Sequence, residues 1–143
     1  MLEVFDSTCV LLAKAEQKHF LYTKARLDKL SLEISPGQLV VLYSLYKKDN
    51  ISISELSKQV CLDNSTLTGI IDRLVRAGLV LRVDTPNDRR SYQIVLTEKA
   101  HRVKPDMLSV MKSVEEKMLE GCTEDEMKLL RTVLQRIYTN LTI

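Results

Sequence analysis

Apolar residues recur every three or four positions along most of the chain, the spacing that puts them on one face of an α-helix. The first such stretch covers about residues 3–30 and contains neither Gly nor Pro. The same spacing returns after Thr97 as far as Gly121, and again over 123–141. Pro105 cannot donate a backbone hydrogen bond, so we expect a kink or a restart there. The pattern predicts a mainly helical protein with long helices at both ends.

Short capping motifs mark where several of these helices begin, because a Ser or Thr side chain can accept hydrogen bonds from the first unpaired backbone N–H groups. Ser35 is followed by Pro36 at the first helical position and by Gln38, which can close a capping box. The same Ser/Thr-x-x-Glu spacing occurs at 52–55 and 123–126. These motifs predict helix starts near residues 36, 53 and 124.

The segment 52–78 reads as two short helices in succession. The capping box at 52–55 opens a helix to about Val60, and the capping cluster 63–65 opens another that runs to Ala77. Gly78 is the expected left-handed residue at its end. The second helix carries a one-sided apolar stripe of Leu67, Ile70, Ile71, Leu74 and Val75. Two helices joined by so short a turn form a helix-turn-helix.

Two β-branched, alternating runs follow directly, at 79–83 and 91–96. The residues between them, 84–90, are rich in turn formers and charge, so the pattern predicts a β-hairpin with a charged tip. A hairpin directly after a helix-turn-helix is the wing of a winged helix. The expected fold class is therefore mainly α (α+β), with a winged helix-turn-helix over 35–100 inside a single domain, 1–143.

The terminal helices carry long apolar stripes that nothing else in one chain is available to cover. A winged helix over 35–100 can close on itself, but the stripes of the first helix and of the helix over 123–141 would be left in water. Pairing two chains through these helices buries both stripes at once. We therefore expect a homodimer whose dimerisation region is formed by 1–30 and 101–143.

Composition and charge restrict the function less than the pattern does. The chain has 143 residues, 45% of them hydrophobic, and a net charge of +2. Residues 63–104 hold eight Lys and Arg against five Asp and Glu, an excess too small to establish nucleic-acid binding by itself. The sequence contains no apolar run long enough to span a membrane and no signal peptide, so we expect a cytoplasmic protein without a membrane partner.

The helix over 64–77 is the candidate for reading DNA. A helix in the major groove needs small polar and basic side chains outward, because base edges are read by hydrogen bonds. Gly69 in mid-helix costs about 1 kcal/mol relative to Ala, which suggests close helix packing or close approach to DNA. An ordinary solvated helix face is the alternative. The outward residues are Ser65, Thr66, Thr68, Gly69, Arg73 and Arg76.

The hairpin tip supplies a second candidate contact, formed by Asp88, Arg89 and Arg90. An Arg side chain can enter the narrow minor groove, and a nearby carboxylate can fix its position beforehand. The alternative is a polar hairpin whose charges serve solubility. Helix and hairpin together would contact double-stranded DNA at two adjacent places.

Four stretches of this sequence resemble the MarR (multiple-antibiotic-resistance regulator) family. LTGIIDRLVRAGLV at 67–80, DTPNDRR at 84–90 and VLTEKA at 95–100 are similar to its recognition helix, wing and exit into the next helix, and QLVVLYSL at 38–45 is similar to its second helix. The resemblance implies a homodimeric transcriptional repressor that responds to an effector, with each winged helix on one half of a pseudo-palindromic operator. It also implies that Asp88, Arg89 and Arg90 are the wing signature.

The same resemblance implies a crevice between the dimer helices and the winged helix, where such regulators sense a small aromatic compound or an oxidant. Cys9 lies roughly where a hydroperoxide-sensing branch keeps its reactive cysteine, but Ala13 stands where one of the tyrosines that polarise the thiol is expected. We therefore interpret Cys9 as an inert thiol buried in a helix seam, with redox sensing as the alternative.

No arrangement of residues in the sequence predicts an enzyme, a metal site or a cofactor. The three cysteines are widely spaced, and His19 and His101 form no metal-binding pair. No nucleophile with a neighbouring base and no phosphate loop is evident. The remaining alternative to a DNA-binding regulator is a winged helix that binds proteins as an adaptor, for which an apolar or acidic recognition face would be expected.

Overall fold

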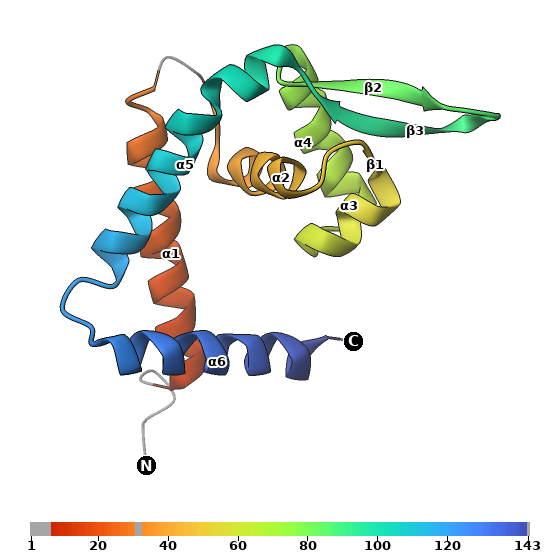
Figure 1. Cartoon of the computed structure of the whole chain (residues 1–143). Helices are drawn as coiled ribbons and strands as arrows, with labels where there is room; N and C mark the ends of the chain where they lie inside the picture. The colour runs from red at the N-terminus through yellow and green to blue at the C-terminus, as the bar shows by residue number, and fades with distance from the viewer. Residues whose placement is uncertain (1–6, 31–32, 143) are drawn as a thin grey trace.

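The computed structural model describes residues 7–30 and 33–142, and within β3 the side chains of Arg89 and Arg90 lie outside the description. It is mainly helical with one small antiparallel sheet (Figure 1). In chain order the elements are α1 (Thr8–Leu27), α2 (Pro36–Lys47), β1 (Ile51–Ser52), α3 (Ile53–Val60), α4 (Asn64–Arg76), β2 (Val80–Thr85), β3 (Asp88–Leu96), α5 (Glu98–Met118) and α6 (Glu124–Leu141).

The predicted capping motifs start the helices, with one difference. Ser35 and Gln38 form a complete capping box at α2, and Thr123 and Glu126 form another at α6. At α3 only half of the box forms: the Ser52 hydroxyl accepts from the Glu55 backbone N–H at 3.2 Å. The Glu55 carboxylate pairs instead with the Lys48 ammonium at 2.5 Å.

The hairpin is confirmed, but its strands are longer than the alternation indicated. β2 continues to Thr85 and β3 begins at Asp88, so the turn is reduced to Pro86 and Asn87, and Asn87 takes the left-handed conformation with φ 67°. Asn tolerates that conformation better than most residues. Residues 88–90 therefore lie in β3 and not in a loop at the tip.

A third strand was missed by the sequence pattern. β1 pairs with β3 through Ile51 opposite Ile94, which gives the strand order β1-β3-β2. Two residues are too few to show the period-two alternation that reveals a strand. β1 matters because it ties the start of α3 to the base of the wing.

The core lies where α2, α3 and α4 meet the sheet and the first turns of α5. Their inward side chains exclude water completely: Leu42, Leu45, Leu56, Leu67, Ile71, Leu74, Leu79, Val80, Ile94 and Ala100 have no exposed surface. The Tyr46 hydroxyl adds a cross-link by donating to the carbonyl of Ala100 at 2.7 Å. These buried residues form the core of the winged helix, from α2 to the start of α5.

Helices α1 and α5 pack side by side and leave the winged helix together (Figure 1). α1 ends at Leu27, three residues before the predicted end, with Asp28 as its C-cap. Of the kink or restart expected at Pro105, the restart is wrong, because α5 continues through this residue as one helix. Its first turns run beside the base of the wing and the rest descends along α1, so the helix changes direction along its length (Figure 1).

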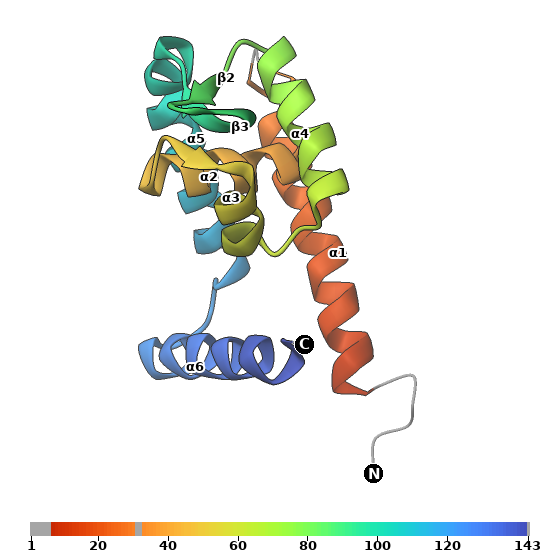
Figure 2. The same cartoon turned by 90° about the vertical axis from the view of Figure 1, so that its right-hand side faces the viewer.

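Helix α6 stands apart from the rest of the chain. It follows a turn in which Gly121 has φ +84°, and both views show it crossing below the winged helix (Figures 1 and 2). None of its residues is buried. Among the described residues, the polar contact that links it to another element is between the Tyr138 hydroxyl and the Cys61 sulfur, at 2.7 Å.

Candidate nucleic-acid interface

Helix α4 separates its residues into a buried and an outward face, as predicted. Leu67, Ile71 and Leu74 are fully buried against the core. The candidate contacts lie on the other side: Ser65, Thr66, Arg73 and Arg76 are exposed, and Thr68 and Gly69 are half-buried. Because the buried stripe fixes the rotation of the helix, the polar residues share one solvent-facing side.

The first turn of α4 is held by its own polar side chains. The Asp63 carboxylate accepts from the backbone N–H of Thr66 at 2.7 Å and from its hydroxyl at 3.1 Å. These hydrogen bonds lower the pKa of Asp63, so the cap is an anion at neutral pH. Thr68 donates its hydroxyl proton to the Asn64 carbonyl at 2.6 Å. Thr66 and Thr68 therefore serve the geometry of the helix as well as its surface chemistry.

Gly69 faces open space, so close packing against another helix does not account for it. A Cβ at this position would meet one neighbouring group, the Arg73 guanidinium at 3.8 Å. No other element in the described part of the chain packs against this position closely enough to exclude a side chain. Of the two reasons considered for a mid-helix glycine, close helix packing is therefore wrong, and close approach of a ligand remains.

The wing follows α4 directly in the chain: β2 contacts α4 at its base, and the two strands extend away from the head (Figure 1). Near its end, the Ser91 hydroxyl lies 3.2 Å from the Asp88 carboxylate and 3.0 Å from the Thr85 hydroxyl. Asp88 thus helps to close the hairpin. Arg89 and Arg90 belong to β3, but their side chains lie outside the described part of the structure.

Sequence reasoning missed a polar cluster between α4 and the wing. The Arg82 guanidinium on β2 forms an ion pair with the Asp72 carboxylate on α4, and it lies 5.6 Å from the centre of the Tyr92 ring on β3. The pairing raises the pKa of Arg82. An Arg two residues after the buried Val80, and so on the same strand face, is the signal that could have indicated a partner on the neighbouring helix.

Comparisons with known proteins show which family the chain belongs to. A model of the MarR family matches residues 34–92. The uncharacterized HTH-type transcriptional regulator YsmB of Bacillus subtilis (strain 168) is 33% identical over 104 residues, which are 73% of this chain and 71% of that protein. The chain belongs to the MarR family. It is a DNA-binding transcriptional regulator, as its sequence indicated.

Solved structures of MarR-type proteins share the whole fold. A cysteine-to-serine mutant of MarR from E. coli in complex with operator DNA superposes with a TM-score of 0.85 at 26% identity, over 95% of this chain and 99% of that one. BpsR of Bordetella bronchiseptica has a TM-score of 0.87 at 22% identity, over 96% and 97%. Nothing in these comparisons favours the alternative of a protein-binding adaptor.

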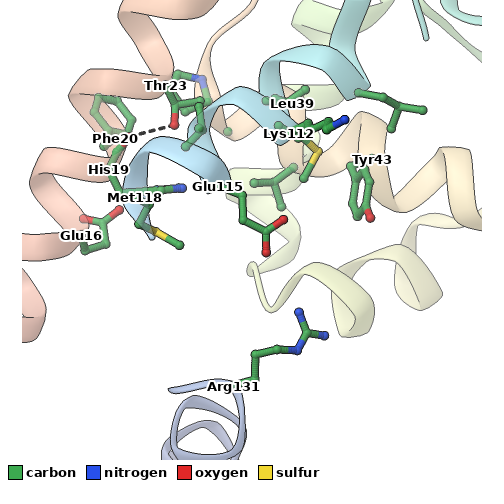
Figure 3. Close-up of a pocket in the computed structure, with 16 residues that line it drawn as sticks. Glu16, His19, Phe20, Thr23, Leu39, Tyr43, Lys112, Glu115, Met118 and Arg131 are labelled. Carbon is green, nitrogen blue, oxygen red and sulfur yellow. Dashed lines mark hydrogen bonds between the residues drawn. The ribbon is translucent and has the colours of Figure 1, made fainter. Parts of the chain in front are cut away.

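A cavity of about 630 Å³ lies between the winged helix and the helices that leave it (Figure 3). Its lining is mostly apolar and comes from four helices, with Phe20 on α1, Tyr43 on α2 and Met118 on α5. The cavity is also lined by charged side chains. Figure 3 shows Glu115 on α5 directed toward the cavity and Arg131 of α6 on the opposite side. The cavity therefore lies where the family resemblance implied a crevice, between the winged helix and the helices outside it.

The cysteines differ from the expectation in one respect. Cys9 on α1 is exposed in the single chain, so the burial predicted for it does not occur within one subunit. Cys61 and Cys122 are exposed too. In the described ranges, no group of His, Cys, Asp or Glu is arranged to hold a metal ion. No described helix combines the length and apolar character needed to cross a bilayer.

Proposed function

We propose that this MarR-family regulator reads operator DNA as a homodimer, with α4 in the major groove and the wing in the adjacent minor groove. One observation carries the proposal: the outward residues Ser65, Arg73 and Arg76 share the exposed face of α4, the helix that contacts the base of the wing. Arg89 and Arg90 on β3 would supply the minor-groove contact, with Asp88 fixing the hairpin end.

The position of the exposed apolar side chains indicates which part of the chain binds DNA and which part forms the dimer. Residues 35–100 form the reading head, and 1–30 with 101–143 form the dimer arm of the same single domain. On α1, Leu11 and Leu21 are exposed, and on α6 so are Leu130, Leu134 and Leu141. A second chain that covers these side chains would set two heads about one helical turn of DNA apart, roughly 34–36 Å.

The cavity is the proposed effector site, and a small aromatic compound is the proposed occupant. Its apolar lining with Phe20 and Tyr43 suits a flat ring, and its rim offers charges of both signs. The cavity is bounded by α2 of the head and by α1, α5 and α6 of the arm. An occupant would favour one head-to-arm geometry over another and so shift the spacing of the two heads.

Repression is the outcome that this arrangement supports. A dimer that occupies promoter DNA excludes polymerase, and an effector that changes the spacing of the heads releases the DNA. BpsR, which has this fold, has its DNA binding regulated by 6-hydroxynicotinic acid. For the present chain, an effector would be recognised by its displacement of bound DNA.

A binding series on a duplex selected from a random library by the parent protein tests the reading head. Arg73→Ala and Arg89→Ala should each weaken specific binding by roughly 1–3 kcal/mol and leave the melting temperature nearly unchanged. Lys128→Ala on α6 is the control, since it removes the same charge from an exposed position of another helix. Parent-like affinity of both arginine variants would sink the assignment.

A further inference from the structure

The wing is packed into the core at its root, and its far half extends away from the head (Figure 1). In its antiparallel register, Val80 lies opposite Leu96, Arg82 opposite Ile94, and Asp84 opposite Tyr92. These pairs share one face of the hairpin, because successive strand residues alternate between faces. The first pair and Ile94 are buried in the core, so packing holds the root.

Beyond Ile94, a polar cluster connects the wing with the recognition helix α4. The Arg82 side chain keeps 30% of its surface exposed, and its guanidinium pairs with Asp72 of α4, which is 51% exposed. The Tyr92 ring of β3 lies against the same guanidinium, with its centre at 5.6 Å. Arg82 is thus held by groups from two other elements, one of them the helix proposed to enter the major groove.

We propose that Asp72, Arg82 and Tyr92 form a pin that sets the angle of the wing relative to α4, and that they act as positioning residues for operator binding. The inference rests on the proposed DNA contacts of α4 and the wing. Two grooves are read at once only if the helix and the hairpin keep a fixed relation. The packed root alone leaves the far half of a two-stranded ribbon free to bend and twist.

Charge supplies a second reason for the pairing. Asp72 is adjacent to Arg73 on the exposed side of α4, where an unpaired carboxylate would repel phosphates. The guanidinium of Arg82 offsets that charge while it holds the wing. Because exposed ion pairs contribute little to folding stability, the geometric role is the one that explains the arrangement.

A charge swap distinguishes positioning from the other roles. Asp72→Arg adds positive charge and Arg82→Asp removes it, so general electrostatics would shift DNA affinity in opposite directions. If Asp72 and Arg82 form the pin, each single variant should weaken specific binding by roughly tenfold or more. The double swap should recover parent affinity within about threefold. If Arg82 instead touches DNA directly, the double swap stays as weak as Arg82→Asp, and the pin is wrong.

Hydroxyl-radical footprinting supplies a readout that loss of stability would not produce. The Asp72→Asn variant, which adds little strain, should lose the wing's minor-groove protection and keep the protection by α4, with an unchanged melting temperature. Swapping Lys117 and Glu120, an exposed pair at the end of α5, is the matched control and should change neither. A parent-like wing footprint in Asp72→Asn would overturn the pin.

The results for Arg89→Ala and for the Asp72 and Arg82 variants distinguish an error in the pin from an error in the proposed DNA contacts. If Arg89→Ala weakens binding while Asp72→Asn and both charge reversals bind like the parent, the wing reads DNA without the pin. If Arg89→Ala is itself silent and the parent shows no minor-groove protection, the wing contact fails, and the pin fails with it.

Discussion

The winged helix and helix α6 both carry apolar stripes at helical spacing, but only the winged helix buries its stripe within the chain. Ile71 and Leu74 of α4 have no exposed surface, whereas Leu134 of α6 is 42% exposed and Leu141 is 71% exposed. Spacing therefore predicts that a helix forms and which side is apolar. It does not say whether the covering surface belongs to the same chain.

This difference in burial determines how each region contributes to the free energy of unfolding. Burying a Leu side chain contributes roughly 1.5–3 kcal/mol, so the head gains its stability from contacts that every single chain makes. The exposed stripes of α1 and α6 gain nothing within one chain, and the proposed dimer would cover them. Damage to the head should therefore lower stability at any protein concentration, while damage to α6 should act through assembly.

The largest effect is expected in the core of the head. Leu45→Ala on α2 removes a fully buried side chain that is not on the polar face of α4, and should lower the free energy of unfolding by about 2–5 kcal/mol. Urea titrations at two protein concentrations measure it, and the loss should be the same at both. A cost that disappears on dilution would mean that α2 is stabilised mainly by assembly.

The next effect separates the arm from the head. Leu134→Asp on α6 places a charge on the proposed dimer surface, so sedimentation should show monomers, and operator affinity should fall by roughly a hundredfold as the two half-sites uncouple. Lys128→Asp on the same helix is the control and should remain dimeric. A dimeric Leu134→Asp variant with parent affinity would show that α6 does not join the chains.

The helix caps give a smaller contrast between the regions. The pKa of Asp63 is lowered in the folded head, so its stabilising effect is complete above the ordinary Asp pKa and is lost as the pH falls through the lowered value. Asp63→Asn keeps a capping side chain and should flatten this acid dependence, as read from melting temperatures at several pH values. Thr123→Ala at α6 removes a cap without a titrating group and should leave the acid dependence as in the parent. An acid dependence that Asp63→Asn does not change would show that other carboxylates set it.

The smallest effect is expected at Cys9. Its side chain is exposed on α1, and Ala13 provides no phenol to polarise the thiol, so an organic hydroperoxide should leave operator binding intact. Cys9→Ser should behave like the parent in the same gel-shift assay. Release of DNA by the oxidised parent but not by Cys9→Ser would instead make the arm a redox sensor.

Local signals predicted much of this molecule because they depend on neighbours in sequence. The capping box of Ser35 and Gln38, the buried stripe of α4 and the hairpin are all set within a few residues. The family resemblance rested on such segments, and the comparisons confirm it.

Features that depend on tertiary structure could not be predicted in the same way. β1 is defined by its pairing with β3, and the Asp72–Arg82 pair joins elements whose relative placement the pattern does not give. The cavity is built from four helices, so no single stretch of sequence indicates it. The restart at Pro105 does not occur: α5 continues as one helix and packs beside α1, a tertiary contact that the sequence pattern does not show.

Cooperation between the two regions is the centre of the proposed function: two heads, joined by the arms, read two half-sites together. Hydroxyl-radical footprinting of the parent on its selected duplex tests this most directly. We predict two symmetric sets of protection whose centres lie roughly one helical turn, about 10 bp, apart, each with adjoining minor-groove protection from a wing. A single protected half-site, bound as tightly in a half-site duplex as in the full one, would contradict it.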